Sequence, residues 1–302
     1  MAKFLIIIGS AKCGTTSLAH WLNQREDMLL GPIKEPRFFT DFGKRNWTGP
    51  GSDIFSETII SSDNAYFANF NGADEETWCI DASTDYIWQP QSAKRIADFS
   101  KEHEVKLVAI VRDPVERAVS EYNHTLRNRD EVLSFEDSLL NEEKRMEKGW
   151  QPLFYHKRRS TVSKDLENYK NIFGDYILIL DFSLTKHPQN MIDEVTNFLQ
   201  LPRCDVDAER IFNQTYLPRN MISSRIMDLK IDQRIENLIP NEGLKKTFRW
   251  YCRRTLTVNS REKRTVSQRE REIFTRSISE EISRCIECDF IPTENWKVPS
   301  FV

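Results

Sequence analysis

Apolar runs alternate with amphipathic segments along the chain as far as about residue 199. Residues 3–8, 106–111 and 176–181 are apolar almost throughout, which is typical of strands buried on both faces, and residues 78–81 form a shorter candidate strand. The segments between them have apolar positions every three or four residues and predict helices over residues 15–25, 91–99, 114–127, 135–148, 162–173 and 188–199. This alternation predicts an α/β fold of three layers around a central parallel sheet.

The rest of the chain has a less regular pattern. Residues 31–77 are rich in glycine, proline, asparagine and aromatic side chains, which predicts mainly irregular structure. Beyond residue 202 the pattern is mostly helical, with a polar loop at residues 258–265 and a long helix from about residue 267. We expect a single domain over residues 1–302, with a helical C-terminal part.

Composition and charge are those of an ordinary globular protein. Of the 302 residues, 39% are hydrophobic and 29% are charged, and the formal net charge is -3. This balance does not favour nucleic acid as a partner, so any anion site has to be local. No apolar run approaches the roughly 20 residues of a membrane-spanning helix and no secretory signal is visible, so we expect a cytoplasmic protein. Nothing in the pattern indicates an oligomeric state.

A glycine-bracketed loop joins the first predicted strand to the first predicted helix. Gly9 and Gly14 allow the backbone to turn and to bring its N–H groups close to an anion. The helix N-terminus adds free N–H groups and a partial positive charge, and Lys12 lies within the loop. Hydroxyl donors follow at Thr15, Thr16 and Ser17. This P-loop-like strand–loop–helix predicts a phosphate site.

The loop departs from the P-loop of nucleotide-triphosphate enzymes at one position. Those enzymes have a lysine directly after the last glycine, whereas this chain has Thr15 there. No apolar strand ends in a lone aspartate that would suit magnesium. The second long apolar run is followed by Arg112, which favours a phosphate, so we expect no metal ion at the site.

A second anion site is predicted directly after that second apolar run. Asp113, Pro114 and Glu116 are typical of a helix start, and Ser120 lies about two turns into the predicted helix. Ligands of parallel α/β sheets bind beyond the carboxyl ends of the strands. Arg112 and Ser120 are therefore expected to close on one phosphate.

These motifs resemble those of the sulfotransferases that use 3′-phosphoadenosine 5′-phosphosulfate (PAPS) as donor. The resemblance is carried by FLIIIGSAKCGTTSL, KEPRFF and LVAIVRDPVERAVSEY, and more weakly by FGDYILILDFSL and VTNFLQLP. The strong part covers most of the first 125 residues and the weaker part extends to residue 202. The branch it resembles most is that of the heparan sulfate and bacterial carbohydrate sulfotransferases.

The resemblance implies a role in donor binding for two groups of residues. The first loop would hold the 5′-phosphosulfate through Lys12, Cys13, Gly14, Thr15 and Thr16. Arg112 and Ser120 would hold the 3′-phosphate, and a late basic loop with Lys263 and Arg264 would cover the adenosine. Lys12 is also expected to stabilise the charge that develops on the leaving phosphate, and this chemistry requires no metal.

The resemblance also implies a general base, because the carbohydrate branch has a glutamate in a motif like KEPRFF. Here that glutamate is Glu35. Arg37 is expected to meet an anionic acceptor or the sulfuryl oxygens, and Tyr86 to line the acceptor cleft. The chain departs from the glycan enzymes at Ala82, where some of them have a lysine. Other branches use a histidine base, and five histidines are available, none in a comparable motif: His20, His103, His124, His156 and His187.

The predicted activity is in-line transfer of a sulfuryl group from PAPS to a hydroxyl of a carbohydrate or a small metabolite. Two alternatives are a P-loop kinase acting on a small molecule and a non-catalytic nucleotide-binding module. The missing lysine after Gly14 weighs against the kinase. The presence of both Lys12 and Glu35 weighs against the non-catalytic module.

Overall fold

The computed structural model describes residues 2–128, 130–207, 216–218, 244, 248, 251–252, 255, 257–259 and 268–297. The chain divides into two compact units, one formed by Met1–Arg210 with Val266–Val302 and the other by Ile211–Thr265. The second unit contains an antiparallel strand pair, β6 (Tyr216–Pro218) and β7 (Thr257–Asn259). Lys263 and Arg264 lie outside the described residues, and all other candidate site residues belong to the first unit.

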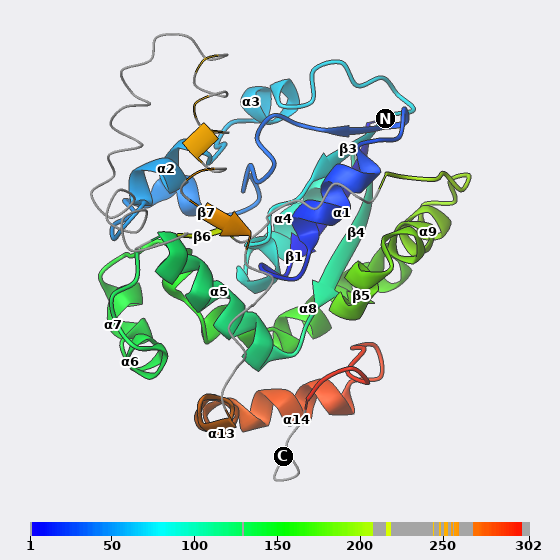
Figure 1. Ribbon diagram of the computed structural model, residues 1–302. Coiled ribbons are helices and arrows are strands. Elements are labelled where there is room, and N and C mark those ends of the chain that lie inside the picture. Colours follow the sequence, from blue (N-terminus) through cyan, green and yellow to red (C-terminus); the bar gives the residue numbers. More distant parts are fainter. Residues whose placement is uncertain are drawn as a thin grey trace. The chain divides into compact units, whose positions relative to one another are not determined.

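The first unit is built on a five-stranded sheet with the order β2-β3-β1-β4-β5, in which every pairing is parallel (Figure 1). Its strands are β1 (Lys3–Gly9), β2 (Met28–Leu30), β3 (Trp78–Asp81), β4 (Glu104–Val111) and β5 (Ile177–Asp181). The α/β fold with a central parallel sheet is therefore confirmed. Because β1 and β4 are neighbours, the loops that follow them meet at the carboxyl edge of the sheet.

Helices cover both faces of this sheet (Figure 1). Helix α1 (Thr15–Leu22) contacts α9 (Pro188–Phe198) on one face, and α4 (Ser92–Phe99) contacts α8 (Ser163–Phe173) on the other. Right-handed crossovers between parallel strands place the helices in this way. Ile6 and Ile8 of β1 pack with Ile96 of α4 and Leu166 of α8 in the larger apolar core, where none of them is exposed.

Several shorter elements differ from the predicted ones. The segment expected to be irregular contains α2 (Ser52–Glu57) and α3 (Asp63–Ala68). Strand β2, which directly precedes this segment, is too short to show a periodicity. The helix predicted over residues 135–148 is two helices, α6 (Phe135–Leu140) and α7 (Glu142–Glu147), which meet at Asn141. The long C-terminal helix likewise breaks at Ile278, whose φ of -130° leaves the helical region, giving α13 (Gln268–Ser277) and α14 (Ser279–Glu287).

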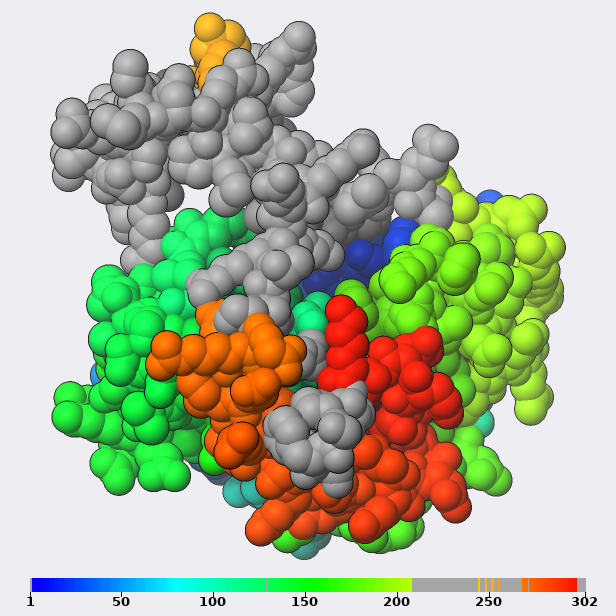
Figure 2. All heavy atoms as spheres, turned by 60° about the horizontal axis from the view of Figure 1, so that its bottom comes forward, coloured from blue at the N-terminus to red at the C-terminus, as the bar shows by residue number. Residues whose placement is uncertain are grey.

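The C-terminal helices of the first unit pack on the helix that follows β4. Phe274, Ile278 and Ile282 are buried with Val115 and Val119 of α5 (Pro114–Asn128) in a second apolar cluster. Figure 2 shows α13 and α14 between the green segment that holds α6 and α7 and the yellow-green segment that holds α9. The sequence-based prediction of a helical C-terminal part is confirmed for this segment.

Candidate functional site

The loop between β1 and α1 presents a row of free donors at the carboxyl edge of the sheet. The amide N–H groups of Lys12, Gly14, Thr15 and Thr16 donate no hydrogen bond to a described residue, and Gly14 provides no side-chain cap for α1. The first N–H groups of a helix have no partner within the helix and carry the positive end of its dipole. The loop therefore has the chemistry of an anion site, and its role in donor binding stays a prediction.

The shape of this loop depends on Gly14. Its φ of 88° lies in the left-handed region, and a Cβ atom at this position would be 2.6 Å from the Cγ2 atom of Thr185. Thr185 belongs to η6 (Phe182–Lys186), the turn that follows β5. Any side chain at position 14 would therefore combine backbone strain with a steric clash. Cys13 is buried and burial raises the pKa of its thiol to about 11, so this residue contributes its backbone to the loop.

Arg112 joins the two predicted anion sites. Its Nη1 donates to the carbonyl oxygen of Lys12 at 3.1 Å, and its guanidinium carbon lies 4.4 Å from the centre of the Phe182 ring. Glu116 Oε2 lies 3.8 Å from Arg112 Nη2. Ser120 is half-buried on α5, and its hydroxyl makes no hydrogen bond with a described residue. The structure thus brings Arg112 to the first loop and leaves the Ser120 hydroxyl available.

Lys12 is a half-buried cation without a described ion-pair or hydrogen-bond partner for its ammonium group. Burial lowers the pKa of this ammonium to about 8, and the nearby positive charges of Arg127 and Arg159 add to the shift. An anion bound in the loop would offset both effects. Lys12 is therefore suited to hold a phosphate or a leaving phosphate oxygen.

Glu35 lies in a tight group of charged and polar side chains. Lys34 Nζ is 2.6 Å from Glu35 Oε1, and Arg37 Nη2 donates to Glu35 Oε2 at 2.7 Å. Burial alone would raise the pKa of this carboxyl, but Lys34 and Arg37 lower it to about 2. The Thr84 hydroxyl also donates to Glu35 Oε2, at 3.4 Å. The carbonyl oxygen of Thr84 would lie 3.1 Å from a Cβ on Gly9, which links Glu35 to the start of the anion loop.

The Arg37 guanidinium hydrogen-bonds to other groups of the protein. Besides Glu35 Oε2, its guanidinium donates to Asp85 Oδ2 at 2.8 Å, to the Thr58 hydroxyl at 2.8 Å and to the Glu35 carbonyl oxygen at 3.0 Å. The structure shows Arg37 as a clamp on Glu35, and its expected contact with acceptor or sulfuryl oxygens stays a prediction.

Tyr86 is placed differently from the sequence-based expectation. It is fully buried, and its hydroxyl donates to Asp81 Oδ2 at 2.7 Å and accepts from the Phe39 N–H at 3.4 Å. The ring packs edge-on against Phe39 in the larger apolar core. Tyr86 does not line an acceptor surface, because the short η2 turn (Tyr86–Trp88) directs it inward.

Three charged residues around this site were not singled out by the sequence. Lys34 was part of the KEPRFF motif but received no role. Asp85 lies in the DASTDY segment, where the chain departs from the glycan enzymes. Arg159 is one of three consecutive basic residues, and its partners Asp85 and Glu121 are far away in sequence. Only the departure at residues 81–86 was a usable signal.

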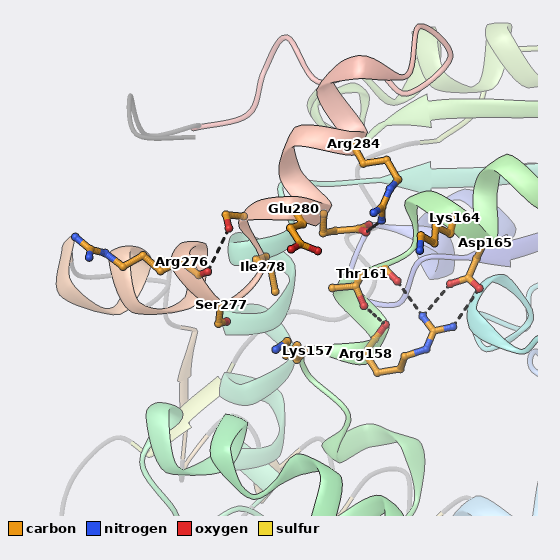
Figure 3. A pocket seen from close by; sticks show the side chains of 12 residues that line it. Lys157, Arg158, Thr161, Lys164, Asp165, Arg276, Ser277, Ile278, Glu280 and Arg284 are labelled. Atoms are coloured by element: carbon orange, nitrogen blue, oxygen red, sulfur yellow. Dashed lines mark hydrogen bonds and ion pairs between the residues drawn. The ribbon is translucent and has the colours of Figure 1, made fainter.

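A groove lined by described residues lies away from these candidate site residues. It measures about 570 Å³ and lies between η4 (Arg158–Ser160), the start of α8, and the helices α13 and α14 (Figure 3). Its lining includes Lys157, Arg158 and Lys164 but no residue of the anion loop, the KEPRFF segment or the β4–α5 turn. Among the described residues, no group of histidine, cysteine, aspartate and glutamate side chains is arranged to hold a metal ion. None of the helices described is long and apolar enough to cross a membrane.

No protein-family model matches the chain, but individual proteins and a solved structure do. The chain is 27% identical over 214 residues to the mouse (Mus musculus) heparan sulfate glucosamine 3-O-sulfotransferase 3A1, an alignment that covers 70% of this chain and 49% of that protein. It is 26% identical over 143 residues to the membrane-associated sulfotransferase kil1 of Dictyostelium discoideum, covering 46% of this chain and 27% of that protein. The chain thus spans about half the length, or less, of these relatives.

A solved structure resembles the chain over nearly all of that structure's length. The crystal structure of a sulfotransferase from Alicyclobacillus acidocaldarius superposes with a TM-score of 0.64 and 29% sequence identity, covering 82% of this chain and 99% of that one. In sequence and in fold the chain is similar to sulfotransferases of the heparan sulfate and bacterial branch.

Proposed function

We propose that this chain transfers a sulfuryl group from PAPS to a hydroxyl group of a carbohydrate acceptor. The observation that carries the proposal is the row of amide donors beside Lys12 that have no partner among the described residues. Arg112 closes this row at the same edge of the sheet. A relative whose name specifies heparan sulfate supports a carbohydrate acceptor, and a small metabolite is the alternative.

The donor's two phosphate ends match the two anion sites. The 5′-phosphosulfate would receive hydrogen bonds from the loop amides and from the hydroxyls of Thr15 and Thr16. The 3′-phosphate would take a forked contact from Arg112 and a hydroxyl from Ser120. Lys263 and Arg264 would cover the adenosine, as the family resemblance implies.

The reaction needs a base for the acceptor hydroxyl and a positive charge for the leaving group. The Glu35 carboxylate takes the hydroxyl proton as the acceptor oxygen forms its bond to sulfur. The bond between sulfur and the bridging oxygen of the 5′-phosphate breaks, and Lys12 neutralises the charge that collects there. The products are the sulfated acceptor, adenosine 3′,5′-bisphosphate and a protonated Glu35, which later returns its proton to water.

The contact with Lys34 has to loosen before Glu35 can act. A carboxylate held by both Lys34 and Arg37 is a weak base, because both positive charges favour its ionised form. Lys34 is the partner that can leave, since a flexible ammonium adapts to new anions more readily than a clamped guanidinium. We infer that acceptor binding draws Lys34 away and restores the basicity of Glu35.

Transfer of radiolabelled sulfate from PAPS onto heparan sulfate oligosaccharides, other glycans and small hydroxyl metabolites tests the proposal. Glu35→Gln is expected to lower kcat by about 100-fold or more while leaving the affinity for adenosine 3′,5′-bisphosphate within about two-fold. Glu57→Gln, an exposed glutamate at the end of α2, is the matched control and should keep full activity. Unchanged turnover in Glu35→Gln would remove Glu35 from the mechanism.

A binding measurement separates this activity from the kinase alternative. Adenosine 3′,5′-bisphosphate should raise the thermal unfolding temperature without magnesium, because a ligand that binds only the folded state stabilises it. A response to ATP that depends on magnesium, with none to the bisphosphate, would instead support a kinase.

A further inference from the structure

Two buried residues outside the predicted site, Asp85 and Arg159, connect the KEPRFF segment to helix α5. Asp85 Oδ2 accepts from Arg37 Nε at 2.8 Å, and Asp85 Oδ1 lies 3.0 Å from Arg159 Nη2. Arg159 Nη1 donates in turn to Glu121 Oε1. Glu121 directly follows Ser120 on α5, so the ion pairs run from the predicted base segment to the helix of the second predicted phosphate site.

These ion pairs are almost fully withdrawn from solvent. The side chains of Asp85 and Glu121 are 1% and 0% exposed, and that of Arg159 is 6% exposed. Arg117 ends the series, with Nη2 at 2.8 Å from Glu121 Oε2. The cluster contains three carboxylates and three guanidinium groups, namely Glu35, Asp85, Glu121, Arg37, Arg117 and Arg159. Lys34, which also contacts Glu35, gives the connected group one more positive charge than it has negative charges.

Stability is a poor reason for such a cluster, because the desolvation of buried charges offsets most of their attraction. Orientation is a better one, since a planar guanidinium fixes the plane of the carboxylates that it contacts. Arg37 holds Glu35 through Nη2 while Asp85 holds Arg37 through Nε, so the direction of the Glu35 carboxylate depends on Asp85. Asp85 is itself fixed by Arg159 and by Trp88 Nε1, which donates to Oδ1 at 2.9 Å.

We propose that Asp85 and Arg159 are positioning residues of the transfer reaction, which fix the Glu35 carboxylate relative to the donor held beside α5. The inference rests on the proposed function and assigns to it two residues that do not touch either substrate. Because near-attack geometry tolerates little displacement, loss of this alignment affects the chemical step more than binding.

Asp85→Asn is the direct test. It keeps the shape of the side chain and an acceptor for Trp88 Nε1, but removes the charge that holds Arg37. With the acceptor that the wild-type protein sulfates, heparan sulfate oligosaccharides being tried first, we expect kcat to fall about ten- to 100-fold. The Kd of adenosine 3′,5′-bisphosphate, measured by calorimetry, should stay within about two-fold of the wild-type value, which also shows that the variant is folded.

Asp165→Asn is the matched control, since it breaks a neighbouring ion pair of the same kind. Asp165 Oδ2 accepts from Arg158 Nη1 at 2.8 Å, and Arg158 belongs to the same short helix η4 as Arg159. Figure 3 shows this pair directed into the groove beside α13 and α14. We expect its kcat to stay within about two-fold of the wild-type value, as for a partly exposed pair.

Two further variants separate positioning from a loss of structure. If Asp85 acts through Glu35, adding Asp85→Asn to Glu35→Gln should change the single-turnover rate by no more than about two-fold. Arg159→Lys keeps the positive charge, but a single ammonium group cannot contact Asp85 and Glu121 with two separate nitrogens as the guanidinium does. We expect a smaller fall in kcat than for Asp85→Asn.

Three results would overturn the inference: wild-type kcat in Asp85→Asn, a full multiplicative loss in the double variant, or bisphosphate affinity lost in step with kcat. Each of these presumes that the wild-type protein transfers sulfate. If it transfers sulfate to no acceptor, the proposed function fails first, and this inference fails with it.

Discussion

Backbone strain at single residues coincides with the proposed site. In the part of the chain that the structure describes, the non-glycine residues with a left-handed φ are Lys12 (67°), Arg37 (53°) and Gln200 (58°). Such conformations cost about 1–3 kcal/mol each and persist only where the surroundings enforce them. The carbonyl oxygen of Lys12 is held by Arg112, and four side-chain hydrogen bonds hold Arg37. Two of the three strained residues, Lys12 and Arg37, are therefore residues that were predicted to act, and Gln200 is not.

The depressed pKa of Lys12 predicts a pH dependence of donor affinity. The anionic donor favours the protonated ammonium, whose pKa in the free protein is about 8, so binding above that pH has to take up a proton. The affinity for adenosine 3′,5′-bisphosphate should therefore fall as pH rises through 8, by at most about ten-fold per pH unit. Calorimetry at pH values from about 7 to about 9.5 measures this dependence.

Lys12→Gln provides the control for that titration. The variant should bind the bisphosphate more weakly than the wild-type protein at pH 7, and with little change as pH rises, because no ammonium titrates. A slope equal to that of the wild-type protein would assign the pH dependence to another group.

At the scale of elements, the start of helix α5 couples stability to the second phosphate site. Asp113 Oδ1 accepts from the N–H groups of Val115 and Glu116, at 2.9 and 3.2 Å, and so caps the helix as predicted. Its Oδ2 accepts from the Lys297 N–H at 3.0 Å, which ties the C-terminal segment to the same point. Ser120 depends on this helix for its position.

Asp113→Ala is expected to lower the free energy of unfolding by about 0.5–2 kcal/mol, the usual contribution of an N-cap. It should also weaken bisphosphate binding, because the helix that carries Ser120 frays. Ser134→Ala removes the corresponding cap of α6, where Ser134 Oγ accepts from the Asp137 N–H at 3.1 Å. It should cost similar stability with no change in affinity. Denaturant unfolding and calorimetry give both quantities, and equal loss of affinity in the two variants would contradict the assignment.

The length and hydrophobicity of an element decide how well it could be predicted from the sequence. Long strands such as β1 and β4 are apolar over most of their length, so hydrophobicity identifies them. The charged residues that follow them, Lys12 and Arg112, could be predicted from the positions of the strand ends. Strand β2 is too short for any pattern. The contact between Asp85 and Arg159 joins segments that only the tertiary fold brings together. For Tyr86, the sequence indicated a position near the site, but it could not show that the side chain packs into the apolar core.

At the scale of the whole molecule, the C-terminal helices complete the unit that carries the site. Glu281 of α14 accepts from the Ser163 N–H and hydroxyl, both at 2.7 Å, at the first turn of α8. The fold class and helical C-terminal part were predictable from alternation and periodicity, but this docking contact was not. The single domain over residues 1–302 stays a prediction, and the chain divides into two compact units.

Glu281→Ala is expected to reduce the free energy of unfolding by about 1–3 kcal/mol, because it leaves the buried Ser163 N–H and hydroxyl without partners. Bisphosphate affinity and kcat at 25 °C should be unchanged, since the contact lies away from the loop. Glu280→Ala, at the exposed neighbouring position, should leave stability within about 0.5 kcal/mol of wild type. Thermal and denaturant unfolding test both, and equal stability of the two variants would show that Glu281 does not dock α14.

The contact between Lys34 and Glu35 also affects how fast water would hydrolyse PAPS when no acceptor is bound. While the two side chains remain paired, a water molecule in the acceptor's place meets a carboxylate too weakly basic to activate it, and water carries no charge that would attract the lysine away. In the absence of acceptor, the pairing of Lys34 with Glu35 would therefore slow the hydrolysis of PAPS. Lys34→Met removes this pairing and should increase the rate of sulfate release from PAPS without acceptor by about ten-fold. A hydrolysis rate equal to that of the wild-type protein would show that the donor is protected by other means.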